Sequence, residues 1–150
     1  MKVLIAYGSK HGSTREIAEA IGKRLSERGL EVRVAEAAAA MLADGDQAMI
    51  VGSSLYLGRW APGSVRAVKK AVAVGFAGPI WLFHSGPTGD EAATKREPFP
   101  KKITELGSKL DVRDWRTFGG KVDPDDHPIM GRALADEAGD WRDWAEIEAW

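Results

Sequence analysis

The hydrophobic pattern of the chain alternates between short apolar runs and longer amphipathic segments. Continuous apolar runs at 3–6, 48–51 and 80–83 are typical of strands that are buried on both faces of a sheet. Two further segments, 30–34 and 112–118, alternate apolar with polar residues, which predicts strands at the edges of the sheet. The pattern therefore predicts five strands, three of them central.

Between these strands, apolar residues recur at the spacing of an α-helix. The stripes predict one helix that begins near Ser13 or Thr14 and closes at Gly29, a second through 65–76 and a third over 98–110. Strands that alternate with helices favour a parallel sheet, because each right-handed crossover places a helix on one of its faces. We therefore expect an α/β protein, a three-layer α/β/α sandwich around a five-stranded parallel sheet.

The C-terminal tail from His127 is also expected to be helical, with a break at Gly139. A second helix start is predicted at Asp143, because Glu146 follows three residues later in the spacing of a capping box. The chain is thus expected to end in a short helix that covers part of the sheet.

Composition narrows the functions that such a sheet can serve. The 150 residues suit one domain over 1–150, and a formal net charge of −1 from 21 basic and 22 acidic residues argues against a general nucleic-acid binder. The chain has no cysteine, so a redox function would depend on a bound cofactor and not on thiols or an iron–sulfur cluster. Met1 and Lys2 lead directly into the first strand, so we expect no signal peptide or membrane span, and a cytoplasmic location.

The first apolar run leads into a loop rich in glycine and hydroxyl residues. Backbone amides in such a loop, together with the positive end of the following helix, favour an anion. The residues expected to contact this anion are Ser9, Lys10, His11, Gly12, Ser13 and Thr14. Serine and threonine are also preferred helix caps, so a capped helix without a ligand is the alternative.

The spacing of the loop argues against several phosphate-binding classes. A nucleoside triphosphate loop needs four residues between its glycines and a lysine after the second, whereas three residues separate Gly8 from Gly12 and Ser13 follows. The dinucleotide fingerprint needs a third glycine, and a response regulator needs an aspartate at the end of the first or third strand. A small hydroxyl loop of this kind instead suits a terminal phosphate that the chain wraps completely.

Ser9, Gly12 and Thr14 match the phosphate loop of flavodoxins, whose pattern is Thr/Ser-x-Thr/Ser-Gly-x-Thr. His11 stands where that pattern has a hydroxyl, and an imidazole can also donate a hydrogen bond to phosphate. The chain resembles the flavodoxin-like family in this loop and in the spacing of its strands. The resemblance implies a flavodoxin-like fold with sheet order 2-1-3-4-5 and non-covalently bound FMN, with the FMN phosphate on residues 9–14.

The stretch 51–60 resembles the branch of this family that includes menaquinone-dependent protoporphyrinogen dehydrogenase. In that branch the corresponding loop lines one side of the isoalloxazine ring, which implies cofactor contacts from Ser53, Ser54, Leu55, Tyr56, Leu57, Gly58 and Trp60. The third loop would supply the other wall, from Ser85, Gly86, Pro87, Thr88, Gly89 and Asp90. Tyr56 or Trp60 would lie near the ring, and ordinary packing is an equal alternative for both.

The resemblance implies an FMN-binding oxidoreductase that passes a hydride or electrons from a reduced small-molecule substrate to a quinone or another acceptor. A non-enzymatic electron carrier for a redox partner protein is the alternative, and a flavin-free or deazaflavin-binding domain is a further one. Cations near the predicted ring end favour an anionic substrate, although a solvated helix face is the default explanation for them. They are Arg59, Arg66, Lys69, Lys70, Lys95, Arg96, Lys101 and Lys102.

His84 ends a central strand and is a candidate for proton transfer, with a purely structural role as the alternative. The pattern singles out no other side chain for catalysis. The three histidines show no ligand spacing with one another or with an acidic pair, so we expect no metal site.

Overall fold

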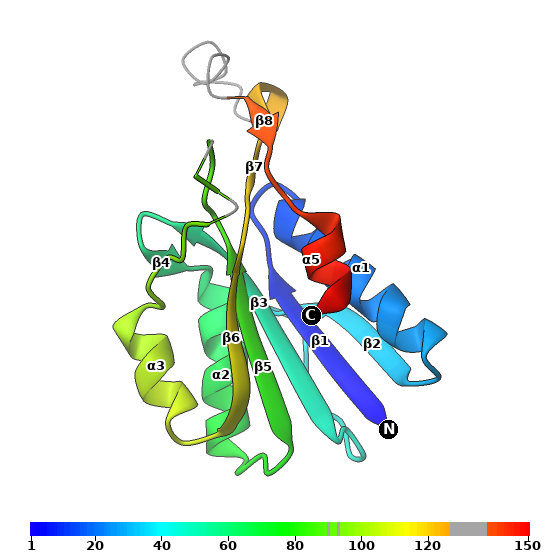
Figure 1. Cartoon of the computed structure of the whole chain (residues 1–150). Coiled ribbons are helices and arrows are strands. Elements are labelled where there is room, and N and C mark those ends of the chain that lie inside the picture. Colours follow the sequence, from blue (N-terminus) through cyan, green and yellow to red (C-terminus); the bar gives the residue numbers. More distant parts are fainter. Residues whose placement is uncertain (90, 93, 127–137) are drawn as a thin grey trace.

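Five parallel strands form the middle layer of the structure, a computed structural model that describes residues 1–89, 91–92, 94–126 and 138–150. The strands are β1 (Lys2–Gly8), β2 (Glu31–Glu36), β3 (Ala48–Tyr56), β5 (Pro79–Ser85) and β6 (Asp111–Phe118). They pair in the order β2-β1-β3-β5-β6 (Figure 1). The predicted order 2-1-3-4-5 is confirmed, because the two-residue β4 (Arg59–Trp60) lies off this path beside β3.

Helices cover both faces of the sheet, as predicted. α1 (Ser13–Glu27) and α5 (Trp144–Ala149) lie on one face, and α2 (Pro62–Ala73) and α3 (Lys101–Gly107) lie on the other (Figure 1). The predicted cap of α5 is confirmed, because the Asp143 carboxylate accepts a hydrogen bond at 3.1 Å from the amide three residues later. These layers leave the carboxyl ends of the strands open to a ligand.

Strand β1 supplies core residues to both faces of the sheet, which explains its continuous apolar sequence. Val3 and Ile5 pack in the cluster that includes Ile147 of α5, whereas Leu4 and Ala6 belong to the cluster on the opposite face. Each of these four side chains is at most 4% exposed. Burial of each large aliphatic side chain contributes about 1.5–3 kcal/mol, so this strand takes a central position.

Two of the predicted helices differ in extent from their apolar stripes: α2 begins and ends three residues earlier, and α3 is shorter. α2 closes before Gly75, which has a φ of 66°, and Phe76 packs on the core from outside the helix. α3 begins only at Lys101, because Pro100 disfavours helical backbone at the preceding residue, Phe99. Both phenylalanines still contact the core, so the apolar pattern identifies buried residues correctly even where they lie outside the helices.

The loop predicted after 48–51 is instead a continuation of β3 to Tyr56, followed by a tight hairpin. β4 pairs antiparallel with the last two residues of β3. Leu57 and Gly58 form the turn, with φ values of 50° and 73°. Positive φ at both central positions gives a turn whose twist matches that of the two strands. The hairpin carries Tyr56 and Leu57 beyond the carboxyl edge of the sheet.

The C-terminal part of the chain contains a second sheet, in which β7 (Lys121–Val122) pairs with β8 (Gly139–Asp140). A single 3-10 turn, η1 (Pro124–Asp126), follows β7. Gly139 therefore lies in a strand, and the helical expectation for the segment from His127 falls outside the described residues. Within the part of the chain that is described, no helix has the length and apolar character needed to span a membrane.

Gly52→Ala is expected to destabilise the fold by about 1–3 kcal/mol, because a Cβ at Gly52 would lie 2.1 Å from the Phe83 ring. The ring is fully buried and tightly packed, so it has no space into which to move. Urea unfolding of both proteins measures the difference. The double variant Gly52→Ala/Phe83→Leu is the control and should lose less than the sum of the two single changes; strict additivity would contradict the clash.

Candidate functional site

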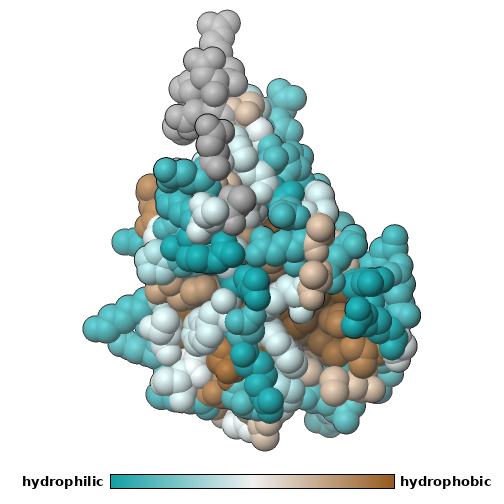
Figure 2. Space-filling view, viewed as in Figure 1, coloured by the Kyte–Doolittle hydropathy of each residue, from teal (hydrophilic) through white to brown (hydrophobic). Residues whose placement is uncertain are grey.

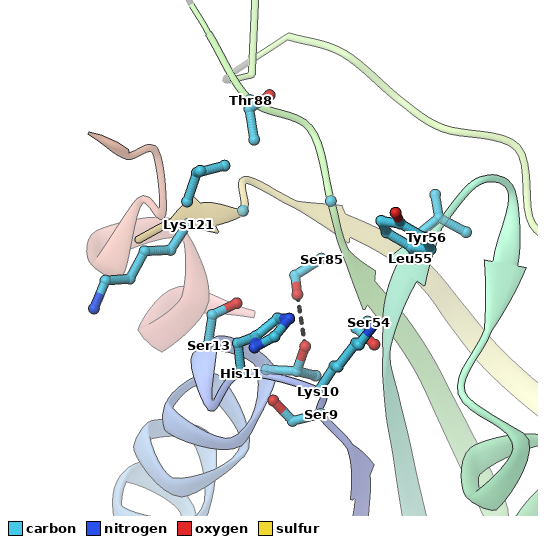
Figure 3. A pocket seen from close by; sticks show the side chains of 14 residues that line it. Ser9, Lys10, His11, Ser13, Ser54, Leu55, Tyr56, Ser85, Thr88 and Lys121 are labelled. Carbon is cyan, nitrogen blue, oxygen red and sulfur yellow. Dashed lines mark hydrogen bonds between the residues drawn. The ribbon is translucent and has the colours of Figure 1, made fainter. Parts of the chain in front are cut away.

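A cavity of about 230 Å³ opens at the carboxyl ends of β1, β3 and β5, where the chain order of the sheet reverses between β1 and β3. Doubly wound α/β sheets bind their ligands at this position. Figure 3 shows side chains from several loops converging on the cavity. Its wall consists of Ser9, Lys10, His11, Ser13, Thr14, Ser54, Leu55, Tyr56, Ser85, Gly86, Thr88, Gly120, Lys121 and Val122.

The loop between β1 and α1 forms one side of the cavity. Gly12 is the N-cap of α1 and has a φ of 86°, a left-handed conformation that favours glycine. The Ser9 hydroxyl accepts a hydrogen bond from the Gly12 amide at 2.9 Å, and Gly12 itself has no side chain that could cap the first turn of α1. The first amides of this 15-residue helix therefore remain available to an anion, which disfavours the alternative of a plain side-chain cap.

Thr14 joins this loop to the neighbouring strand. Its hydroxyl oxygen lies 2.8 Å from the hydroxyl oxygen of Ser85, at the end of β5 (Figure 3). Both side chains are buried. Thr14 therefore holds the start of α1 against the sheet, and the partly exposed Ser9 and Ser13 provide the more accessible hydroxyl groups of the loop.

Tyr56 forms the wall at the end of β3 and is 60% exposed. The Lys10 Nζ lies 5.2 Å from the centroid of the Tyr56 ring, in a cation–π contact. Lys121 lies on the opposite side of the cavity (Figure 3). An exposed aromatic ring at the rim offers a flat surface on which a planar ligand can stack.

The charge of the wall is positive. Its basic side chains are Lys10, His11 and Lys121, and none of the described residues that line it is aspartate or glutamate. Lysine side chains and a helix start without an N-cap side chain, on the same cavity, favour an anionic ligand. This preference is local, since the formal net charge of the whole chain is −1.

Two of the residues predicted to contact the isoalloxazine ring do not line this cavity. Ser53 is buried, and its hydroxyl donates to the Ser54 carbonyl and accepts from the Ala61 amide, both at 2.9 Å. Trp60 is 5% exposed and packs in the core. Ser53 lies in the parallel part of β3, between β1 and β5. Trp60 is held in the core by the pairing of β4 with β3. Tyr56 is therefore the aromatic residue of this hairpin that is available to a ligand in the cavity.

The tips of two loops also lie outside the wall. Leu57 and Gly58 form the hairpin turn and do not line this cavity. In the third loop, neither Pro87 nor Gly89 lines it, and Pro87 is buried. Asp90 lies outside the described residues. The third loop thus reaches the cavity mainly through the residues next to the end of β5.

His84 is fully buried and does not line the cavity. Its Nδ1 accepts a hydrogen bond from the Trp60 indole at 3.1 Å, and its Nε2 lies 2.9 Å from the Thr117 hydroxyl oxygen. The ring also stacks on Phe99, with centroids 4.0 Å apart. Burial lowers the pKa of His84 to about 4, which the backbone and charge of Glu97 oppose only in part. This geometry favours the structural role over proton transfer.

Gly120, Lys121 and Val122 line the cavity although the sequence pattern did not single them out. They follow β6, whose carboxyl end lies at the same edge of the sheet. The glycine pair 119–120 directly after a predicted strand is the local signal that indicates this fourth loop. The Gly120 amide donates to the Pro87 carbonyl at 2.7 Å, which joins the fourth loop to the third.

Arg142 connects the C-terminal segment to the start of α1, and its side chain is only 4% exposed. Its guanidinium donates to the Ser13 carbonyl at 3.2 Å, to Glu16 at 2.5 Å, and to the two Asp140 oxygens at 2.9 and 2.7 Å. Asp140 lies in β8, directly opposite the cavity residue Lys121 in β7. Hydrogen bonds from Arg142 keep the pKa of Asp140 below its ordinary value. No local pattern indicates the contact with Ser13, which joins residues 129 positions apart.

A second cavity of about 680 Å³ adjoins the first, between the hairpin and the start of α2. Its wall consists of Ser9, Lys10, Ser54, Tyr56, Leu57, Arg59, Trp60, Ala61 and Pro62. The residues common to both cavities, which form their boundary, are Ser9, Lys10, Ser54 and Tyr56. Of the cations that the sequence placed near the ring end, Arg59 alone lines either of these two cavities.

The sheet and the cavity together define a class of small doubly wound α/β domain with a cavity at the switch point of its parallel sheet. The sequence matches the flavodoxin domain family over residues 4–135. The chain belongs to this family. The expected flavodoxin-like domain is thereby confirmed.

Solved structures share this fold. A cysteine-to-serine mutant of flavodoxin from Pseudomonas aeruginosa is 22% identical, with a TM-score of 0.62 over 99% of this chain and 97% of that chain. A flavodoxin from the domain Archaea is 22% identical, with a TM-score of 0.61 over 91% of this chain and 97% of that chain. The rubredoxin oxygen:oxidoreductase of Desulfovibrio gigas is 16% identical, with a TM-score of 0.63 over 99% of this chain and 36% of that chain.

Proposed function

We infer that the chain binds FMN non-covalently in the smaller cavity and serves in electron transfer. The observation that carries this proposal is the start of α1, where left-handed Gly12 and the absence of a side-chain cap leave helix amides facing a cavity with no described carboxylate in its wall. That arrangement suits a phosphate. The exposed ring of Tyr56, on the same cavity, suits the planar end of a flavin.

The residues of the cavity have distinct proposed roles. The amides and hydroxyls of Ser9 and Ser13 bind the phosphate, and the imidazole of His11 offers a further N–H donor beside it. Tyr56 provides one face for the ring, and the third and fourth loops provide the other side of the cavity. When bound, FMN supplies the group that accepts a hydride or electrons, while the protein positions it and limits its contact with water.

The finer proposal is an oxidoreductase related to menaquinone-dependent protoporphyrinogen dehydrogenase, which takes electrons from a reduced small molecule and passes them to a quinone or another acceptor. Arg59 in the wall of the second cavity supports it, because a positive side chain beside the flavin site favours an anionic substrate over a basic protein partner. A non-enzymatic electron carrier is the second candidate. It is favoured by the likeness to flavodoxins over nearly their full length.

Paired titrations with FMN and riboflavin test the cofactor and the position of its phosphate. We expect FMN to bind with a Kd of about 1 µM or less, and riboflavin to bind about 100-fold more weakly, because riboflavin lacks the phosphate. Quenching of flavin fluorescence measures both constants. Equal affinities would contradict the phosphate site, and no binding of either flavin would contradict the proposal and direct the search to deazaflavins.

Gly12 variants refine this test. In Gly12→Ala the left-handed conformation costs about 1 kcal/mol, so FMN affinity is expected to fall about five-fold. No atom lies within 4 Å of the added Cβ, so the effect is conformational and not a clash. Gly12→Asn is the matched control, because asparagine tolerates this conformation, and it should retain more of the affinity. Riboflavin affinity should change in neither variant.

Potentiometric reduction of the FMN-loaded protein separates the oxidoreductase from the carrier. A carrier is expected to be reduced in two one-electron steps that are well separated in potential. An oxidoreductase that transfers a hydride is expected to be reduced in a single two-electron step. The first result would contradict the finer proposal while leaving FMN binding intact.

A further inference from the structure

The second cavity has no role in holding the flavin proposed above, although it shares Lys10 and Tyr56 with the first cavity. Its remaining wall comes from the hairpin and the start of α2. At about 680 Å³ it falls within the range of cavities that bind small organic molecules. A ligand in this cavity would contact Tyr56, which also borders the first cavity.

The wall combines apolar surface with uncompensated positive charge. Leu57, Trp60 and Pro62 contribute apolar surface, and Lys10 and Arg59 contribute the charge. None of the described residues in the wall is aspartate or glutamate.

Neither cation of this wall has an ion-pair partner among the described residues. Other arginines on the surface do have one, such as Arg33 with Asp46 at 2.7 Å and Arg113 with Asp111 at 2.8 Å. Arg59 and Lys10 are thus two positive groups on one cavity that the fold itself does not use in ion pairs. Lys10 does contact the Tyr56 ring, which holds its ammonium group near the boundary between the cavities.

Leu57 is a second and independent indication of a ligand. It has a φ of 50°, in the left-handed region that glycine and asparagine adopt far more readily, and its side chain is 85% exposed. Leucine at this position therefore does not stabilise the turn, and it exposes apolar surface to water. Its side chain does line the cavity, so an apolar contact with a ligand accounts for its presence.

We propose that the second cavity binds a small aromatic carboxylate, with the carboxylate on Arg59 and Lys10 and the flat apolar body against Leu57 and Tyr56. The guanidinium of Arg59 can hold a carboxylate through two parallel hydrogen bonds. This inference deepens the proposed function and rests on it, because the bound molecule is assigned as the reduced substrate. It gives up two electrons and two protons, which FMN in the adjoining cavity would take up and the quinone or other acceptor would then receive. The substrate class is thus an anion with an apolar ring system.

The binding test uses 2-naphthoate as the probe and its neutral analogue 2-naphthalenemethanol as the comparison, with the FMN-loaded protein in a calorimeter. Naphthoate is expected to bind about ten-fold more tightly than the alcohol, because only the acid can pair with the cations. This advantage should shrink as NaCl is raised from about 50 to 500 mM. Equal binding of the two probes would overturn the proposal.

Three variants localise the site. Arg59→Gln should weaken naphthoate about ten-fold, whereas Arg66→Gln, which removes an exposed arginine of α2 that lines neither cavity, should change it less than about two-fold. Leu57→Asn should weaken naphthoate about five-fold while the melting temperature stays the same or rises, because asparagine suits the turn. A loss of stability in Leu57→Asn, or an unchanged naphthoate affinity in Arg59→Gln, would contradict the assignment.

FMN affinity distinguishes failure of this inference from failure of the proposed function. Arg59, Leu57 and Arg66 do not line the first cavity, so all three variants should bind FMN like the wild type. Displacement of FMN by naphthoate would overturn the inference, because the two molecules would then share one site. If the wild type binds no FMN, the same titration on the flavin-free protein still tests the anion site, and a loss in Arg59→Gln would support that site while the redox assignment falls.

Discussion

Replacement of His84 by asparagine is expected to flatten the pH dependence of stability between about pH 6.5 and 4. In the unfolded chain His84 takes up a proton near pH 6.5, whereas burial lowers its pKa to about 4 in the fold. The unfolded state binds more protons over this interval, so wild-type stability falls as the pH is lowered. The loss at pH 4 is about 3 kcal/mol, since each pKa unit corresponds to about 1.4 kcal/mol.

The hydrogen bonds of His84 explain why its charged form does not fit the fold. The Trp60 indole can only donate, so His84 Nδ1 accepts, and the proton of the neutral ring lies on Nε2, which donates to Thr117. A second proton on Nδ1 would face the indole N–H. Asparagine can accept from the indole and cannot be charged, although it loses the stacking on Phe99.

Urea unfolding near pH 7, 5.5 and 4.5 measures this effect. His84→Asn should be less stable than the wild type near pH 7, by about 1–3 kcal/mol, and should lose little more at the lower pH values. Phe99→Leu is the matched control, because it removes the stacking partner and leaves the titrating imidazole of His84, so it should lower stability but keep the wild-type slope. A wild-type slope in His84→Asn would show that other groups carry the acid sensitivity.

Arg142→Ala is expected to lower the free energy of unfolding by about 2–3 kcal/mol at neutral pH and to weaken FMN binding. The change removes the donor that joins the Ser13 carbonyl, Glu16 and Asp140. Ser13 begins α1 beside the cavity, and Asp140 pairs with Lys121 across the small second sheet. Loss of the guanidinium therefore loosens two sides of the cavity together. Urea unfolding and FMN titration of the same samples measure both effects.

Arg142→Lys is the control for charge, because lysine keeps the positive charge but lacks the planar fork, and its stability should lie between those of the wild type and Arg142→Ala. The dependence of unfolding free energy on pH in the acid range gives a separate test. The pKa of Asp140 is lowered chiefly by its hydrogen bond from Arg142, so the stabilisation is present above its ordinary value of 3.8 and is lost as the pH falls through the lower folded value. Arg142→Ala should lose stability less steeply in this range. The same pH dependence in the wild type and in Arg142→Ala would contradict the pairing of Asp140 with Arg142.

The sequence predicted the parts of the fold that depend on neighbouring residues. The buried run 3–6 identifies a central strand, because burial on both faces requires apolar residues in succession. The loop 9–14 is recognisable for the same reason, since its glycine and hydroxyl groups are contiguous and lead directly into α1. The shortened α3 shows the limit, because the same apolar pattern also marks residues such as Phe99 that pack on the core outside a helix.

By itself, then, the sequence determined the five-stranded α/β architecture and the position of the phosphate-type loop, because hydrophobic periodicity and turn chemistry are local properties. Only the tertiary structure decided which aromatic residue is exposed, since the pairing of β4 with β3 buries Trp60 against His84 and leaves Tyr56 at the rim. It also decided that Lys121 enters the cavity wall and that Arg142 binds the start of α1. These contacts join distant parts of the chain, and their geometry depends on packing that no local pattern encodes.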